Sequence, residues 1–160
     1  MIVMETMEKG EVIAIASDHA GFLLKSILCK DLESLGYKIL DMGTDNLESV
    51  DYPLFAHKVA AAVASGKAGY GVILCGTGIG VSITANRHPG VRAALCHNVE
   101  TARLGRKHNN ANVLALGARI IDEAVAKSCL REFLDTEFED GGRHARRVGL
   151  MSSVPKTKYR

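Results

Sequence analysis

The chain has 160 residues, of which 47% are hydrophobic and 24% are charged, values typical of a soluble globular protein. Its 20 Lys and Arg residues nearly balance its 18 Asp and Glu residues, and the net charge of +2 gives no support to a nucleic-acid-binding or membrane protein. No apolar stretch approaches the roughly 18 residues that a membrane-spanning helix needs. We therefore expect one domain with its own core and no membrane association.

The cysteines are far apart in the sequence and form neither a C-x-x-C pair nor a zinc-ligand pattern. This usage predicts reduced thiols and a cytoplasmic protein. We expect residues 1–10 (MIVMETMEKG) to be a short disordered extension, with Met1, Met4 and Met7 as alternative starts. The single domain is predicted over residues 11–148, and residues 149–160 are expected to form a polar basic tail.

Short apolar runs alternate with longer amphipathic segments along the chain. The runs that predict strands are residues 12–16, 37–41, 71–75, 91–96 and 113–116. Helices are expected after the first strand, over 54–64, from the glycine loop to residue 85, after the fourth strand and over 124–134. In the first helix one face is predicted to carry Leu23, Leu24, Ile27, Leu28, Leu32 and Leu35. This alternation favours an α/β fold with five mostly parallel strands and helices on both faces.

Ligand sites of open parallel sheets lie outside the carboxyl ends of the strands. Three polar turns are candidates: residues 17–19 (Ser-Asp-His), residues 75–80 (Cys-Gly-Thr-Gly-Ile-Gly) and the segment around His108 and Asn109. Asp18 could be a site residue, a helix N-cap, or both. His108 could also be an ordinary surface histidine. We expect the third segment to lie at the same edge of the sheet as the other two.

The glycine loop after the third strand resembles a dinucleotide-binding fingerprint but departs from it. Gly76, Gly78 and Gly80 have the spacing G-x-G-x-G, and Val81 stands where the last glycine belongs. The acidic residue expected about 20 residues further on is missing, and no Lys-Ser/Thr pair indicates a triphosphate loop. The loop could still offer backbone N–H groups to an anion. The alternative is a purely structural glycine turn.

Cys75 precedes this loop directly, where a thiol pKa of about 8.5 can be lowered enough to make a general base or nucleophile. A packing role is the alternative for any single cysteine, and we assign Cys29, Cys96 and Cys129 to packing.

A cationic segment near the C-terminus contains Arg143, His144, Arg146 and Arg147, to which Arg119 can be added. Arginine suits bidentate binding of phosphate. The alternatives are a solvated tail and a nucleic-acid-binding arm. The segment has no aromatic residue for base stacking, which counts against the arm.

Five segments together resemble the type B ribose-5-phosphate isomerase family, which includes galactose-6-phosphate and allose-6-phosphate isomerases. They are SDHAGFLLK, MGTDNLESVDYP, ILCGTGIGVSITANR, RKHNNANVLALGAR and DGGRHARR, in that order over residues 12–148. The resemblance implies a Rossmann-like three-layer sandwich, and a homodimer or dimer of dimers in which the C-terminal tail packs on a partner subunit. It also implies interconversion of aldose and ketose phosphates without a metal ion or nucleotide.

The resemblance further implies a role for each candidate residue. Cys75 would be the base that moves a proton between C1 and C2, with Thr77 supporting the thiolate, and His108 would open the sugar ring. Backbone N–H groups of Gly76, Thr77, Gly78, Ile79 and Gly80 would stabilise the enediolate. The expected substrate contacts are Asp18, His19, Asn109 and Arg119, with Arg143 and Arg147 binding phosphate from the neighbouring subunit.

Ribose 5-phosphate is the expected substrate, in the non-oxidative branch of the pentose phosphate pathway. The alternatives are an isomerase of allose 6-phosphate or galactose 6-phosphate and, less favoured, a small nucleotide-binding domain.

Overall fold

The computed structural model describes residues 11–156, so the predicted disordered extension and residues 157–160 lie outside the described part. The strands are β1 (Val12–Ser17), β2 (Lys38–Asp41), β3 (Tyr70–Cys75), β4 (Ala93–Leu95) and β5 (Val113–Gly117). The helices are α1 (Phe22–Ser34), α2 (Tyr52–Ala64), α3 (Ile79–Ala85), α4 (Val99–Asn109), α5 (Glu123–Asp135) and α6 (Gly142–Met151).

All five strands are parallel, and they form one sheet in the order β2-β1-β3-β5-β4. This confirms the predicted five-stranded α/β fold. In the centre, Ala14 of β1 pairs with Gly71 of β3, which pairs in turn with Val113 of β5. The order reverses between β1 and β3, because the chain leaves β1 toward one side of the sheet and β3 toward the other. A crevice is expected at their carboxyl ends.

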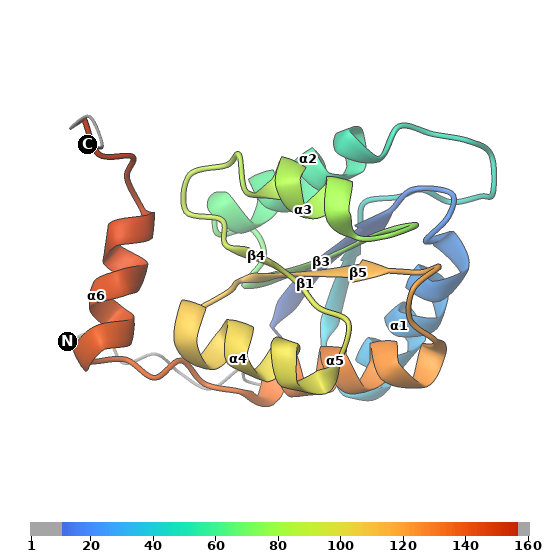
Figure 1. Cartoon of the computed structure of the whole chain (residues 1–160). Helices are drawn as coiled ribbons and strands as arrows, with labels where there is room; N and C mark the ends of the chain where they lie inside the picture. Colours follow the sequence, from blue (N-terminus) through green and yellow to red (C-terminus); the bar gives the residue numbers. More distant parts are fainter. Residues whose placement is uncertain (1–10, 157–160) are drawn as a thin grey trace.

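Helices cover both faces of the sheet, with α2 and α3 on one side and α1, α4 and α5 on the other (Figure 1). Alternation along β1 divides its side chains between the two cores: Ile13 and Ile15 face α1 and α5, and Ala14 and Ala16 face α2. A Cβ atom on Gly71 would lie 2.5 Å from Val59 Cγ1. The small residues on this face therefore let α2 lie close to the sheet.

Two local expectations are wrong. The fourth strand is only Ala93–Leu95, shorter than the predicted 91–96. Leu23 is 61% exposed, although the helical pattern placed it on the buried face. It follows the N-cap Gly21 by two residues, and the buried face of α1 is carried by Leu24, Leu28 and Leu32 instead.

The C-terminal segment is a helix rather than an extended tail. Helix α6 stands apart from the sheet and its covering helices, beside the end of α4 (Figure 1). His144 is the one buried residue in α6, and the predicted boundary at residue 148 falls inside the helix. Arginine, alanine and leucine favour a helix, and the packing of His144 against His108 of α4 supports a helix this short. No helix within residues 11–156 is both long and apolar enough to cross a membrane.

Candidate active site

The carboxyl ends of β1 and β3 bring two of the predicted turns together. Asp18 follows β1 directly, and its backbone N–H donates to the carbonyl of Leu74, the residue before Cys75 (3.2 Å). Its carboxylate accepts from the N–H of Gly21 at 3.1 Å. Asp18 is therefore fixed by the turn that begins α1 and lies one strand away from the candidate thiol.

Cys75 ends β3 with its side chain 5% exposed. Its Sγ accepts a hydrogen bond of 3.1 Å from the backbone N–H of Gly78. The Cys75 carbonyl accepts from Ala118 and the Gly76 carbonyl from Arg119, each at 2.9 Å, so the turn after β5 anchors the loop. An N–H donor is thus held where it can stabilise negative charge on the sulfur.

Gly78 occupies a position that only glycine can fill without rearrangement. Its φ is +77°, and a Cβ atom there would lie 2.5 Å from Leu95 Cδ1 and 2.9 Å from the carbonyl carbon of Leu116. The left-handed conformation directs the Gly78 N–H toward the sulfur, and the missing side chain lets the loop approach β5.

The remaining loop residues are arranged around the same point. Thr77 Oγ1 accepts from the N–H of Ile79 at 3.2 Å, which leaves the hydroxyl hydrogen available for donation. Both side chains are exposed. A Cβ atom on Gly80 would lie 2.5 Å from the ring of Tyr52, so this tyrosine borders the loop. Sequence analysis missed Tyr52 because it predicted a helix only from residue 54, although Asp-Tyr-Pro is a typical helix start and α2 begins at Tyr52.

His19 and Arg119 provide cationic or donor groups at this edge. Nδ1 of His19 accepts from the N–H of Val50 at 3.2 Å, so the neutral ring carries its hydrogen on Nε2. Arg119 is exposed, and its guanidinium lies beside Gly76, where Nη1 would be 3.3 Å from an added Cβ. Both can donate to an anion bound over the loop.

The third predicted turn lies at the opposite edge of the sheet, and its expected placement is wrong. His108 and Asn109 end α4, and residues 110–112 then lead into the start of β5. The carbonyl of Asn112 accepts from the N–H of Gly71, which is near the beginning of β3. A helix that follows a parallel strand returns the chain to the amino edge, so residues just before a strand cannot share an edge with residues just after one.

His108 and Asn109 instead lie with the cationic helix. The ring of His108 stacks on His144 of α6 at a centroid distance of 4.2 Å and an angle of 4°. Burial lowers the pKa of His144, and the positive charges of His108, Arg143 and Arg147 lower it further against the opposing effect of Glu139. Arg143 and Arg147 are exposed on the same helix. One chain therefore divides the predicted site residues between two edges.

The other cysteines are packing residues. Cys96 and Cys129 are buried, Cys29 is partly buried against the same core, and all are free thiols. Burial raises the pKa of Cys96 to about 11, and burial with the charge of Asp41 does the same for Cys29. These shifts keep both thiols protonated near neutral pH, which suits an inert packing role.

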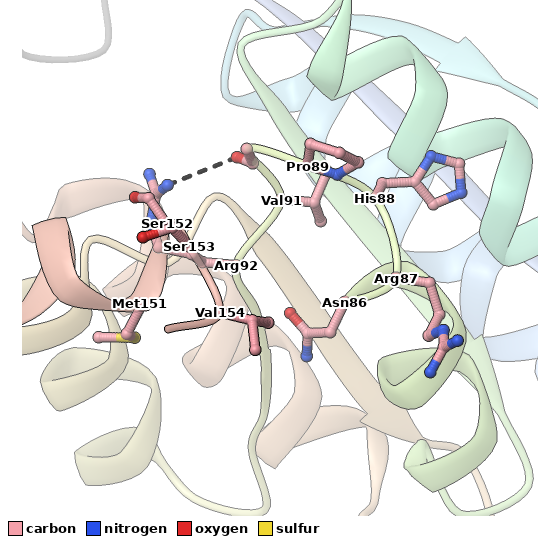
Figure 2. Close-up of a pocket in the computed structure, with 11 residues that line it drawn as sticks. Asn86, Arg87, His88, Pro89, Val91, Arg92, Met151, Ser152, Ser153 and Val154 are labelled. Carbon is pink, nitrogen blue, oxygen red and sulfur yellow. Dashed lines mark hydrogen bonds between the residues drawn. The ribbon is translucent and has the colours of Figure 1, made fainter. Parts of the chain in front are cut away.

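A groove at the amino side of β4 lies between the end of α6 and the loop before that strand (Figure 2). It is lined by residues 86–92 and 151–154, and it contains none of the predicted site residues.

The fold and the carboxyl edge define a Rossmann-like α/β protein with a thiol held beside a glycine-rich loop. The model of the ribose/galactose isomerase family matches residues 13–151. The chain therefore belongs to the ribose/galactose isomerase family, and it is a sugar phosphate isomerase.

Individual relatives are similar over nearly their whole length. Ribose-5-phosphate isomerase B of Escherichia coli is 40% identical over 91% of this chain and 97% of its own. D-erythrulose-4-phosphate isomerase of Pectobacterium atrosepticum is 44% identical over 81% of this chain and 86% of its own. The structure of Clostridium thermocellum ribose-5-phosphate isomerase B has a TM-score of 0.87 at 49% identity and covers 88% of this chain and 95% of that one.

Proposed function

We propose that the protein interconverts ribose 5-phosphate and ribulose 5-phosphate through an enediolate, with Cys75 as the base. The observation that carries this proposal is the sulfur of Cys75 beside the Gly78 N–H, at the edge of the sheet that also holds Asp18. Relatives named as ribose-5-phosphate isomerase B support the choice of substrate. Four free thiols favour a reducing compartment, and we place the reaction in the cytoplasm.

We further propose that each active site is assembled from two copies of the chain. One copy supplies the carboxyl edge with Cys75, and the second supplies the amino-edge cluster of His108, Asn109, Arg143 and Arg147. This arrangement uses all the predicted residues, although they lie at opposite edges of one chain. A two-fold dimer would bury two such sites, because each copy offers both edges.

The proposed reaction begins when His108 of the second copy gives a proton to the ring oxygen of the furanose while the anomeric hydroxyl loses its proton to water, which opens the sugar to an aldehyde. The imidazole then regains a proton from solvent. The Cys75 thiolate then removes the proton from C2, and the electron pair moves to the carbonyl oxygen to give the enediolate. The same thiol returns the proton to C1, and a proton passes from O2 to O1, giving the ketose. Cys75 ends as the thiolate, so the cycle needs no redox partner.

Backbone N–H groups of the loop are the proposed stabilisers of the enediolate oxygens, with a contribution of about 3 kcal/mol per donor. The Thr77 hydroxyl would donate to the thiolate or to a substrate oxygen. His19 and Arg119 of one copy, with Arg143 and Arg147 of the second, would hold the phosphate and so orient C1 and C2 over the sulfur. Asp18 and Asn109 would contact sugar hydroxyls.

The primary test is the isomerase activity of Cys75→Ala measured against Cys29→Ser. Loss of a general base lowers turnover by about 10²- to 10⁴-fold. Cys29→Ser is the matched control, because it removes a thiol from α1 rather than from the carboxyl end of β3, and it should retain turnover. Near-normal turnover of a folded Cys75→Ala variant would refute the assignment of the base.

Substrates of another chain length are the second candidate function, because the Pectobacterium relative is named for a four-carbon sugar phosphate. A panel of ribose 5-phosphate, erythrulose 4-phosphate, allose 6-phosphate and galactose 6-phosphate, compared by kcat/KM, separates the possibilities. We expect the highest value for ribose 5-phosphate. A higher value for any other member would reassign the substrate and leave the mechanism in place.

A further inference from the structure

Three potential metal ligands meet at the amino edge, away from Cys75. They come from separate segments: His108 from the last turn of α4, Glu139 from the linker before α6, and His144 from the first turn of α6. One ligand atom from each lies within 4.8 Å of the others. Among the His, Cys, Asp and Glu residues within 11–156, no other group of three or more comes close enough together to share an ion.

The two imidazoles are placed as neighbours but are not tied to other protein groups. Their rings are stacked with centroids 4.2 Å apart, and across residues 11–156 neither ring makes a hydrogen bond to the protein. Zinc–nitrogen bonds are about 2.0–2.1 Å long, so two nitrogens on one ion lie at most about 4.2 Å apart. Parallel rings hold their in-plane lone pairs in parallel planes, and a rotation about each Cβ–Cγ bond would direct both toward a shared ion.

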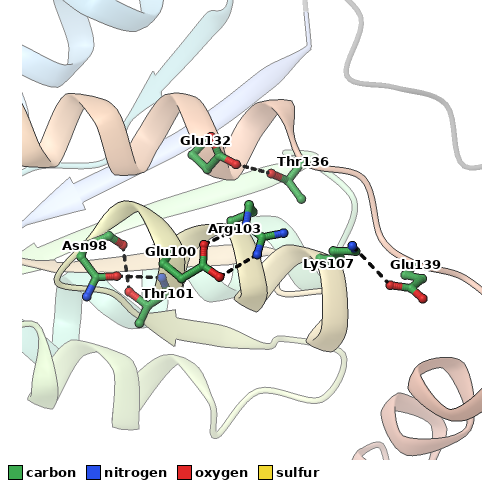
Figure 3. Close-up of polar contacts among 8 residues, drawn as sticks. All are labelled: Asn98, Glu100, Thr101, Arg103, Lys107, Glu132, Thr136 and Glu139. Atoms are coloured by element: carbon green, nitrogen blue, oxygen red, sulfur yellow. Dashed lines mark hydrogen bonds and ion pairs between the residues drawn. The ribbon is translucent and has the colours of Figure 1, made fainter.

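The linker that carries Glu139 is fixed to α4 at two points. Arg106 Nε donates to the carbonyl of Thr136 at 3.2 Å, and the N–H of Glu139 donates to the carbonyl of Lys107 at 2.9 Å. The Glu139 carboxylate lies 3.7 Å from Lys107 Nζ (Figure 3). This exposed ion pair is weak, so an ion could displace the ammonium at little cost.

The donor set indicates the kind of ion. Two imidazole nitrogens and one carboxylate oxygen suit borderline transition metals such as Zn²⁺, whereas Mg²⁺ and Ca²⁺ prefer oxygen ligands only. Arg143 and Arg147 lie on the same helix as His144 and raise the local positive potential, which counts against tight binding of any cation. We therefore expect an affinity well below that of structural zinc sites.

We propose that His108, Glu139 and His144 bind a Zn²⁺-like divalent transition-metal ion, and that the bound ion inhibits isomerisation by occupying His108. The inhibitory half rests on the proposed function, in which His108 opens the sugar ring of the substrate held by a second copy. The binding half rests only on the cluster itself. An ion at this point would also fasten α6 to the end of α4.

Binding is measured directly, with the visible absorption of Co²⁺ and with Zn²⁺ competition against a chromophoric chelator. The full-length chain carries Cys75→Ala in every sample, so that the thiol at the carboxyl edge cannot hold the metal. Removing a ligand with Glu139→Gln or His144→Asn should weaken binding by at least about tenfold, since even outer partners of metal ligands are worth this much. Glu139 is exposed, so its substitution leaves the fold intact.

Two further variants test the direction of the change in metal affinity and provide a control. Lys107→Gln removes the competing ammonium and should strengthen binding about two- to fivefold. His57→Asn removes one member of a separate histidine pair, in which His57 Nδ1 lies 2.7 Å from His88 Nε2, and should change nothing. Equal affinities in the parent, Glu139→Gln and His144→Asn chains would overturn the site.

Activity is measured separately, with Cys75 restored and Zn²⁺ added at its measured dissociation constant. The parent chain should lose about half its activity and recover it with EDTA, while Glu139→Gln should be resistant. Equal inhibition of both chains, or ligand-dependent binding without inhibition, would overturn the inhibitory half. If no chain isomerised ribose 5-phosphate in EDTA while the binding series behaved as expected, the proposed function would fail and the metal site would stand.

Discussion

Two inactive variants of this protein should restore each other when their subunits are mixed. Cys75 lies at the carboxyl edge, and His108 precedes the amino edge of β5. Along β5 the four steps from Val113, which pairs with Gly71, to Gly117, which pairs with Cys75, span about 13 Å. His108 is further from the thiol still, so one chain cannot bring both groups to one substrate. A site that uses both must draw them from two copies.

The perturbation is a pair of single variants, Cys75→Ala and His108→Asn, each expected to retain little activity alone. In a mixed two-fold dimer, one site receives both substituted residues and the other receives the intact Cys75 of one copy and the intact His108 of the other. An equal mixture with random assortment contains about half mixed dimers, each with about half of its sites native, and so should recover about a quarter of the parent activity.

The assay is steady-state isomerisation of ribose 5-phosphate after co-expression or after subunit exchange in mild denaturant. Each variant exchanged with itself is the control, and it should recover nothing. If both groups acted from the same chain, no site in the mixed dimer would be intact, and the mixture would stay as inactive as its parts. That result would refute the shared site even if both residues proved essential.

Four further variants and two measurements on Cys96 test the packing of the site and its surroundings. Gly78→Ala should lower the free energy of unfolding by about 4 kcal/mol, because it adds left-handed backbone strain to a steric clash with Leu95 and Leu116. Gly90→Ala, at φ +79° with no atom within 4 Å, has only the strain and should cost about 1 kcal/mol. Both are measured by chemical denaturation. Asp41→Ala should cost about 3 kcal/mol, because it leaves the buried Lys25 ammonium without its partner. Lys25→Met leaves only a hydrated carboxylate and should cost about 1 kcal/mol. Equal costs would contradict the reasoning. Cys96, with a pKa of about 11, should alkylate about 100-fold more slowly at pH 8 than an ordinary thiol, measured by peptide mass spectrometry. Its raised pKa should also lower the free energy of unfolding as pH rises from about 9 to 11, because the unfolded thiol ionises first.

Sequence patterns were sufficient for the sheet and for the loop at its carboxyl edge. The five strands follow from the alternation of apolar runs and amphipathic segments. The placement of Cys75 at the end of β3 follows from its position as the last residue of an apolar run. These features depend on neighbours in the sequence. The predicted edge for His108 was wrong, although the same pattern predicts the correct one. A segment between a helix and the next parallel strand must lie at the amino edge.

Other features could not be read from local patterns because distant segments determine them. The stacking of His108 on His144 depends on how the linker after α5 runs along the end of α4. Two hydrogen bonds fix that path: the Arg106 side chain donates to the carbonyl of Thr136, and the Lys107 carbonyl accepts from the N–H of Glu139. Tyr52 approaches Gly80 only because α2 and α3 cover the same face. In both cases the sequence contains the residues but not the tertiary contact between them.

The division of the chain into two edges also changes the meaning of its near-zero net charge. Around Cys75 the groups that can bind an anion are mostly neutral N–H donors of one loop, with Arg119 as an exposed cation. The arginines of α6 lie at the other edge, on a helix that buries little against its own chain. Neither edge alone combines a thiol, a ring-opening acid and enough positive charge for a phosphate. Two copies facing each other combine all three, so in the proposed dimer α6 contributes to the active site of its partner rather than to the core of its own chain.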